Sequence, residues 1–434
     1  MIIAEIHNRA RKVYTLLVLK TGLDRFWPDA LVRLSDVVYP HALDVPDDDF
    51  NRRQAVRECV LALSRHSFTG IGFRQENEMS DTQSMSIFDG HNDSLLHLFP
   101  EGTEDRRSFL VQSNHGHLDL PRARQGGFAG GMFAVCPPSG SDWSYGGALT
   151  VSADGYRVDM APAIEMTEAR RFTFSALAAL FRLEAASDGQ IQVVRRADEL
   201  ESCLDQGVLA VVLHFEGAEA IDPDLDALYV FYETGLRSLG IVWSRPNAFG
   251  HGVPFGFPLS PDTGPGLTDA GHKLVRACNA LGILIDLAHL NERGFWDVAR
   301  LSDAPLVSSH TAAHAICPST RNLTDEQLDA IGASGGVVGV NFQVSDLRPD
   351  GQFDDNTPLS VWVRHVNHIV ERIGVEHVAF GSDFDGARIS REISDASGLP
   401  KLVEALRAHG YDEAALRKIA NENWVRVLRD TWRA

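Results

Sequence analysis

Cysteine and positive charge are both scarce in this chain. The five cysteines among 434 residues are odd in number, and no two stand at the spacing of a zinc ribbon or a redox pair. A disulfide framework and a thiolate zinc knot are therefore not supported. Acidic residues outnumber lysine and arginine by 59 to 40, and the net charge of −19 argues against nucleic acid or an anionic membrane as the main partner. These features favour a reducing, cytoplasmic setting.

Long apolar runs are also missing. No stretch reaches the length of a membrane span, and residues 1–23 carry scattered charges and no small-residue cleavage site, unlike a secretory signal. Internal repeats and low-complexity linkers are absent as well. With 44% hydrophobic and 23% charged residues, the composition is that of a globular chain able to bury a large core.

Eight short apolar runs alternate with amphipathic segments along most of the chain. The runs, rich in Val, Ile, Leu or Phe, predict buried strands over 86–91, 131–135, 208–215, 238–243, 283–288, 305–309, 336–342 and 377–382. Apolar spacing predicts helices over 164–184, 222–235, 267–281, 291–301, 324–334 and 358–373, with a capping box at Thr324 to Gln327. This alternation predicts an α/β fold, a (β/α)₈ TIM barrel, with residues 391–434 forming two closing helices.

Residues 1–78 differ from the rest of the chain, because they carry helix-like patterns and no strand rhythm. One interpretation is a helical N-terminal extension packed on a barrel domain of residues 79–434. The other is a leader upstream of the true start, whose conformation would be poorly determined. The second is favoured, because Met79 stands close to the first predicted strand.

Polar side chains follow five of the predicted strands, at the point where each strand ends. The sets are Asp89, His91 and Asp93; His214 and Glu216; Asp286 and His289; Ser308 to His310; and Asp383 and Asp385. Because the carboxyl ends of barrel strands meet at one mouth, we expect these side chains to converge. Imidazoles and carboxylates together are ligands for a divalent metal ion, so the pattern predicts a metal site at one mouth of the barrel.

The acids and histidines of these sets have different expected roles. His91 and Asp93 share a face, although Asp93 alone could equally cap the following helix. Glu216 ends an apolar run, where a carboxylate is costly to bury unless it is paired, and its two oxygens can bridge two cations. A single buried histidine is more often a core residue, but His289 and His310 end consecutive strands beside these carboxylates and are expected to be ligands.

Other polar residues are expected to act around the metal ligands. Asp383 is the best candidate for a general base and acid. Arg321 could fork onto a substrate carboxylate or be a solvated loop charge. Asp89 and His214 are expected to support ligands or lie in the core. Asp385 is expected to organise a turn. His314, four residues after His310, is left out of the site because the sequence has no HExxH pattern and His310 should still be on a strand. His115 and His117 are left out because no strand leads into them.

Seven stretches together resemble the membrane (renal) dipeptidase family of zinc peptidases. They are FDGHND, HLDLPRARQGG, HFEGAEAI, IDLAHL, SSHTAAHAICPSTRN, GGVVGVNF and FGSDFDG, between residues 86 and 390. The resemblance implies a (β/α)₈ barrel that binds two zinc ions and hydrolyses dipeptides, often with a D-residue at the C-terminal position. By position, it implies that His91 and Asp93 hold one zinc, that Glu216 bridges, and that His289 and His310 hold the other. It also implies that Asp383 transfers the proton and that Arg321 holds the substrate's C-terminal carboxylate.

The sequence departs from this family at two substrate-contact positions. Ser244 stands where the fourth strand of relatives ends in a histidine that polarises the scissile carbonyl, and Gln343 replaces an aromatic hydroxyl. Candidates for the missing donor are Arg245, Asn247 and His251. The expected substrate-binding residues are Arg321, Ser244, Asn247 and Gln343.

The expected reaction follows from the charges. Two divalent ions would turn a bridging water into hydroxide near neutral pH, and Asp383 would carry its proton to the leaving amine. The alternative is a related metal-dependent barrel hydrolase acting on another amide, a lactone or a phosphoester, because fold and metal do not fix the substrate. A barrel kept only as a binding protein would have lost at least one ligand, and all five are present. A homodimer is the default expectation for such barrels.

Overall fold

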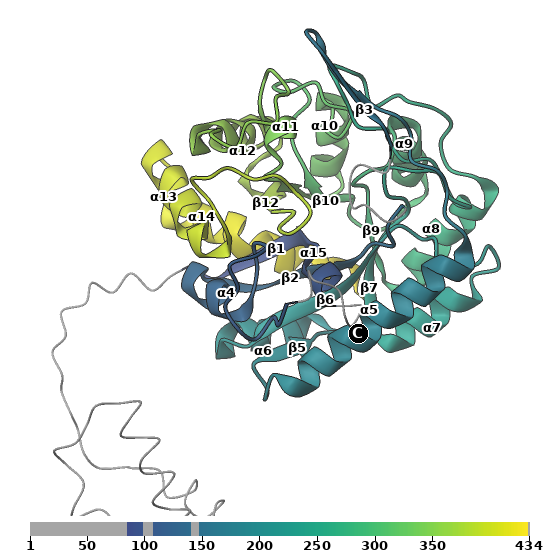
Figure 1. Cartoon of the computed structure of the whole chain (residues 1–434), viewed down its shortest axis with the longest axis horizontal. Coiled ribbons are helices and arrows are strands. Elements are labelled where there is room, and N and C mark those ends of the chain that lie inside the picture. Colours follow the sequence, from purple (N-terminus) through teal and green to yellow (C-terminus); the bar gives the residue numbers. More distant parts are fainter. Residues whose placement is uncertain (1–84, 99–106, 140–146, 433–434) are drawn as a thin grey trace, which may run out of the picture. The chain divides into compact units, whose positions relative to one another are not determined.

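The barrel is an almost continuous ring of parallel strands. The computed structural model describes residues 85–98, 107–139 and 147–432 (Figure 1). Its eight barrel strands, in chain order and in ring order, are β1 (Ile87–Asn92), β2 (Phe128–Val135), β6 (Leu209–Glu216), β7 (Leu236–Gly240), β9 (Leu284–Asp286), β10 (Val307–Thr311), β11 (Val337–Val340) and β12 (Val378–Phe380). Each matches a predicted strand, so the barrel prediction is confirmed. The predicted extension over 1–78 lies outside the described residues.

The ring closes between the first and last strands at the mouth that carries the polar side chains. Asn92 and Phe384 form a parallel bridge. Beside it, the amide of Asp93 donates to the carbonyl of Phe384 at 2.8 Å, and the amide of Asp383 donates to the carbonyl of His91 at 3.0 Å. Closure therefore brings the beginning and the end of the barrel sequence to one place.

Alternation along β6 explains why an apolar strand ends in polar groups. Val212, His214 and Glu216 are buried and share one face, because successive side chains of a strand point to opposite sides. Val212 belongs to the apolar cluster that includes Phe88 and Trp424. The Trp424 indole N–H donates to the carbonyl of Phe380 at 2.9 Å. The polar residues thus lie in layers above a packed floor, as in other filled barrels.

The helices cover the outside of the ring (Figure 1). The six predicted ones are present as α5 (Met166–Ala186), α7 (Asp226–Thr234), α8 (Asp269–Leu281), α9 (Glu292–Leu301), α10 (Asp325–Ala333) and α12 (Leu359–Ile373). The capping box at Thr324 and Gln327 is formed. The two closing helices are α13 (Leu399–His409) and a longer helix in which α14 (Glu413–Arg417), a π-helical turn (Lys418–Glu422) and α15 (Asn423–Thr431) run on without a break.

Several short elements were not predicted. They are α4 (Leu120–Gly126), α6 (Ala197–Gln206), α11 (Val344–Leu347), three short 3₁₀ helices (Ser94–His97, Val375–His377 and Ala396–Gly398), β5 (Ile191–Val193), which pairs with β6, and an antiparallel sheet of β3 (Leu149–Ser152), β4 (Gly155–Val158) and β8 (Gly256–Phe257). None of the helices in the described part of the chain is long and apolar enough to cross a membrane.

Candidate metal centre

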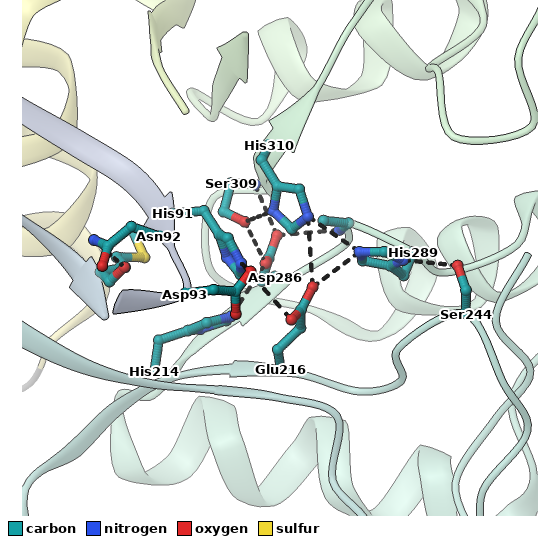
Figure 2. Close-up of polar contacts among 12 residues, drawn as sticks. His91, Asn92, Asp93, His214, Glu216, Ser244, Asp286, His289, Ser309 and His310 are labelled. Carbon is teal, nitrogen blue, oxygen red and sulfur yellow. Dashed lines mark hydrogen bonds and ion pairs between the residues drawn. The ribbon is translucent and has the colours of Figure 1, made fainter. Parts of the chain in front are cut away.

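Glu216, the last residue of β6, is the centre of the polar cluster. Its Oε1 lies 2.9 Å from Nε2 of His289 and 3.5 Å from Nε2 of His310. Its Oε2 lies 3.7 Å from Nε2 of His91. Figure 2 shows the three imidazoles turned toward this one carboxylate. The predicted convergence of side chains from strands far apart in the sequence is therefore present.

One half of the cluster consists of the neutral imidazoles of His289 and His310. Their Nε2 atoms are 3.1 Å apart. Burial holds the pKa of each ring well below its usual range, and the charge of Arg321 adds to this effect. Two imidazole lone pairs and a carboxylate oxygen so close together repel one another unless a proton or a cation lies among them. The donor set therefore fits a divalent metal ion.

The other half consists of His91, Asp93 and Asp383, whose candidate ligand atoms lie within 4.8 Å of one another. Burial alone would lower the pKa of His91, but the carboxylates of Glu216, Asp93 and Asp383 outweigh it and raise that pKa to about 10. Neither ring nitrogen of His91, nor Oδ1 of Asp93, has a hydrogen-bond partner among the described residues. Buried polar atoms without partners are rare and point to a group that the protein binds.

Left-handed backbone occurs at two residues of the cluster, His289 and Asp383, and at the neighbouring Asp385, whose side chain binds the surrounding loop. The φ angles are 63° at His289, 59° at Asp383 and 70° at Asp385. Such conformations are uncommon outside glycine, although His, Asp and Asn adopt them more readily than other residues, and they concentrate at functional sites. A Cβ atom at Gly386 would overlap carboxylate oxygens of both Asp93 and Asp383, so only glycine leaves them room.

Asp383 lies at the rim of the cluster and is partly exposed. Burial raises its pKa well above the usual range; the nearby acids Asp93 and Glu216 add to the shift, and His91 opposes it. Glu216 is affected in the same way, since burial raises its pKa to about 7. Perturbed acids of this kind are typical of catalytic sites.

A second layer of polar residues supports the first. The backbone N–H and hydroxyl of Ser382 donate to Asp89 at 2.6 and 2.7 Å. The hydroxyl of Ser309 donates to Asp286 at 2.5 Å and lies 2.8 Å from Nδ1 of His310. The contacts of Asp89 are to Ser382, and a supporting role for Asp89 stays a prediction. The roles of Asp286 and Ser309 were missed, although Ser309 directly precedes a predicted ligand and Asp286 ends a predicted strand.

The expected substrate-binding residues differ in position. Arg321 is only 5% exposed, so it is not a solvated loop charge, and its Nη2 donates to the carbonyl of His310 at 3.1 Å. The hydroxyl of Ser244 lies 2.8 Å from Nδ1 of His289. The amide of Asn247 donates to the carbonyl of Ile241 and its oxygen accepts from Phe249 N–H, so this side chain organises its own turn.

Gln343 accepts the backbone N–H of Arg388 at 2.7 Å and donates to the hydroxyl of Ser345 at 2.9 Å. It thereby joins α11 to the loop after β12. Substrate binding by Ser244, Asn247 and Gln343 stays a prediction.

The other candidate donors and the excluded histidines have partners elsewhere. The side chain of Arg245 is buried against Glu219 and Ser139, both at 2.8 Å. Nε2 of His314 lies 2.9 Å from the carbonyl of Leu259. His117 accepts the backbone N–H of Asp385 at 3.0 Å, and Asp385 also receives the hydroxyl of Ser94 at 2.6 Å, so Asp385 holds the loop together as expected.

Comparisons with known proteins point to a peptidase family. The model of the membrane dipeptidase family, peptidase family M19, matches residues 76–434. A structure of a dipeptidase, a metallopeptidase of family M19, is 49% identical, with a TM-score of 0.77 over 81% of this chain and 100% of its own.

A second similar structure is a metallopeptidase from Rhodobacter sphaeroides, solved with a phosphinate mimic of the dipeptide L-Ala-D-Ala. It is 49% identical, with a TM-score of 0.77 over 80% of this chain and 100% of its own. An uncharacterized protein encoded in the pqqA 5′ region of Klebsiella pneumoniae is 49% identical over 256 residues, which are 59% of this chain and 94% of that protein.

Proposed function

Since the chain belongs to the membrane dipeptidase family, peptidase family M19, and is a metallopeptidase, we propose that it hydrolyses dipeptides at the cluster around Glu216. The observation that carries the proposal is the convergence of three imidazoles, those of His91, His289 and His310, on this one buried carboxylate. The dipeptide mimic bound by the 49% identical Rhodobacter sphaeroides protein supports a dipeptide substrate, including L-D pairs. Its phosphinate imitates the tetrahedral carbon formed when water attacks the peptide carbonyl.

The proposed cofactor is a pair of zinc ions. His91 and Asp93 would hold one ion, His289 and His310 the other, and Glu216 both, because its two oxygens face different imidazoles. When bound, the ions supply Lewis acidity, which makes water nucleophilic near neutral pH and stabilises charge developing on the carbonyl oxygen.

Asp383 is proposed to move the proton. It takes the proton of the attacking water and returns it to the leaving amine, which requires a carboxyl group whose affinity for protons is higher than usual. Asp383 is supported as this group by its place beside His91 and Asp93, and its partly exposed position leaves it accessible to substrate.

Arg321 is proposed to hold the C-terminal carboxylate of the dipeptide. Its side chain makes one described hydrogen bond, to the carbonyl of His310, and the guanidinium has further N–H donors to offer. A paired carboxylate would fix the distance from the chain end to the scissile bond, so longer peptides would be poor substrates.

The proposal is tested by removing and restoring the metal. Purified protein is dialysed against a chelator, reloaded with zinc, and assayed on L-Ala-L-Ala, L-Ala-D-Ala, a tripeptide, a lactone and a phosphoester. We expect dipeptide cleavage to disappear with the metal and return with zinc. Glu216→Gln, which keeps the shape of the side chain, should weaken zinc binding by more than the roughly 10- to 100-fold that loss of an outer partner costs.

Two outcomes would contradict the proposal. Cleavage that survives the chelator would exclude metal catalysis. Cleavage of the lactone or phosphoester with no dipeptide turned over would favour the related barrel hydrolase, for which the altered positions Ser244 and Gln343 leave room.

A further inference from the structure

The hydroxyl of Ser309 lies between an acid and one of the proposed ligands. It is 2.5 Å from Oδ2 of Asp286 and 2.8 Å from Nδ1 of His310. All three residues are at most 1% exposed, so these groups depend on one another for hydrogen bonds. Figure 2 shows Ser309 beside the His310 ring, with Asp286 behind.

Counting protons along this chain fixes its direction. The Asp286 carboxylate acts as an acceptor, because Oδ1 also receives the backbone N–H groups of Ser309 at 2.7 Å and Ala288 at 3.1 Å. The single hydroxyl proton of Ser309 therefore goes to Oδ2 of Asp286. Since the hydroxyl has no second proton, Nδ1 of His310 must be the donor of the remaining hydrogen bond.

A proton on Nδ1 leaves a lone pair on Nε2 of the same ring. That Nε2 is the atom that lies 3.5 Å from Oε1 of Glu216. We infer that Asp286 and Ser309 are positioning residues, which act through a hydrogen-bond chain to hold His310 in the one neutral tautomer that can bind a cation through Nε2. The inference rests on the metal site of the proposed function.

Backbone of neighbouring strands packs tightly against Ser309. Ser309 is on β10 and Asp286 is on the neighbouring strand β9, with Val307 and Asp286 in register. A Cβ atom at any of Gly90, Gly339 and Gly381 would overlap the carbonyl oxygen of Ser309. The backbones of β1, β11 and the residue after β12 can therefore approach Ser309 only because each has a glycine there.

The companion ligand is arranged differently. Ser244 makes a hydrogen bond of 2.8 Å with Nδ1 of His289, but no described acid accepts from its hydroxyl. That hydroxyl can donate or accept, so Ser244 by itself does not select the tautomer of His289, whose Nε2 lies 2.9 Å from Oε1 of Glu216. By contrast, the Asp286 carboxylate accepts the hydroxyl proton of Ser309 and so fixes the direction of the hydrogen bond between Ser309 and His310.

The decisive variant is Asp286→Asn, which keeps the shape and replaces one oxygen by an NH₂ group. The two backbone N–H donors should hold the remaining oxygen at the Oδ1 position, so the NH₂ group would donate to Ser309. The hydroxyl of Ser309 would then donate to Nδ1 of His310, and the imidazole proton would move to Nε2, where it blocks cation binding.

The primary readout is ¹⁵N NMR of metal-free protein labelled at histidine, with His310 assigned by its loss in His310→Gln. We expect Nδ1–H in the wild type and Nε2–H in Asp286→Asn. The second readout is zinc binding by calorimetry, which should weaken by roughly 10- to 100-fold, the usual cost of losing an outer partner of a ligand. An unchanged Nδ1–H tautomer in a folded Asp286→Asn protein would overturn the inference.

Two serine variants complete the test if Asp286→Asn does not fold. Ser309→Ala removes the chain without changing any charge, and it should weaken zinc binding and leave both tautomers of His310 populated. Ser308→Ala is the matched control, because the neighbouring Ser308 is also buried and its hydroxyl has no partner among the described residues. Equal zinc affinity in the two variants would reject the positioning role.

The proposed function can fail separately. If wild-type protein binds no divalent cation in calorimetry, the metal site is wrong, whereas the tautomer of His310 in metal-free protein still decides whether the hydrogen-bond chain has the inferred direction.

Discussion

The buried histidines at the barrel mouth and the buried histidine of α12 use their ring nitrogens in opposite ways. In α12, Nδ1 of His365 accepts the backbone N–H of Ala313 at 3.0 Å, and Nε2 lies 2.8 Å from the carbonyl of Leu347. Both nitrogens are therefore used by the backbone. At the mouth, the Nε2 atoms of His289 and His310 face each other and Glu216, and neither nitrogen of His91 has a described hydrogen bond.

The hydrogen bonds of the ring nitrogens distinguish a structural histidine from a candidate metal ligand, whereas burial does not. His365 and His91 are both fully buried. What distinguishes them is whether the fold itself completes the ring and whether carboxylates surround it. His214 is intermediate, because Nδ1 is 2.9 Å from the hydroxyl of Ser238 while Nε2 lies 3.6 Å from Asp286, too far for a hydrogen bond.

The largest effect is expected from a change at the mouth that leaves the fold intact. Asp383→Asn should lower kcat by roughly 10²- to 10⁴-fold, the range for loss of a general acid and base. Asparagine adopts the left-handed backbone of this position as readily as aspartate, so zinc content and thermal stability should stay close to wild type. The measurement is kcat on L-Ala-D-Ala at matched zinc occupancy, and near-native kcat would remove Asp383 from the chemistry.

A change at His365 should have the reverse character, affecting stability and not chemistry. Burial lowers the pKa of His365 to about 4 from its usual 6.5. The unfolded chain therefore binds a proton between pH 6.5 and 4 that the folded chain excludes. Stability from this residue is full above pH 6.5 and falls as the pH is lowered toward 4, by up to about 3 kcal/mol.

His365→Gln should remove this share of the pH dependence, because glutamine can keep both backbone hydrogen bonds and does not titrate. Urea denaturation from pH 7 to 4.5 measures the effect, with His409→Gln, at an exposed position, as the control. An identical pH dependence in His365→Gln and wild type would mean that this ring is not the excluded proton site.

The smallest effect, on zinc affinity, is expected for a change at Ser244, which contacts the proposed ligand His289. Ser244→Ala should weaken zinc binding by about 10-fold, at the low end for loss of an outer partner, since no acid fixes the direction of this hydrogen bond. Calorimetry beside Asp286→Asn measures the difference. A larger loss in Ser244→Ala than in Asp286→Asn would contradict the importance given to the acid.

Much of the fold could be predicted because barrel strands are buried on both faces. Every residue of β6 is buried, so the strand is an apolar run that ends abruptly in Glu216. The short strands β3, β4 and β8 escaped prediction for the opposite reason: β3 is exposed throughout, and β8 has two residues. Their pairing depends on tertiary contacts that local patterns do not contain.

The site could be predicted only as far as strand ends reveal it. His289 and His310 follow from their places after two strands, because the carboxyl ends of barrel strands share a mouth. The link from Asp286 through Ser309 could not be found in the same way, since it depends on the register between two strands. Ser244 and Asn247 illustrate the same limit, because their hydrogen-bond partners are set by the loop conformation.

The bridge between Asn92 and Phe384 determines at which stage of folding the active site can form. The proposed ligands His91 and Asp93 of the opening strand meet Asp383, the proposed proton-transfer acid after the closing strand, only after this seam has formed. A chain still lacking its last strand would have no assembled centre, so unfinished molecules should be unable to cleave anything. Hydrolysis would then begin together with completion of the ring, and its onset during refolding would time that final step.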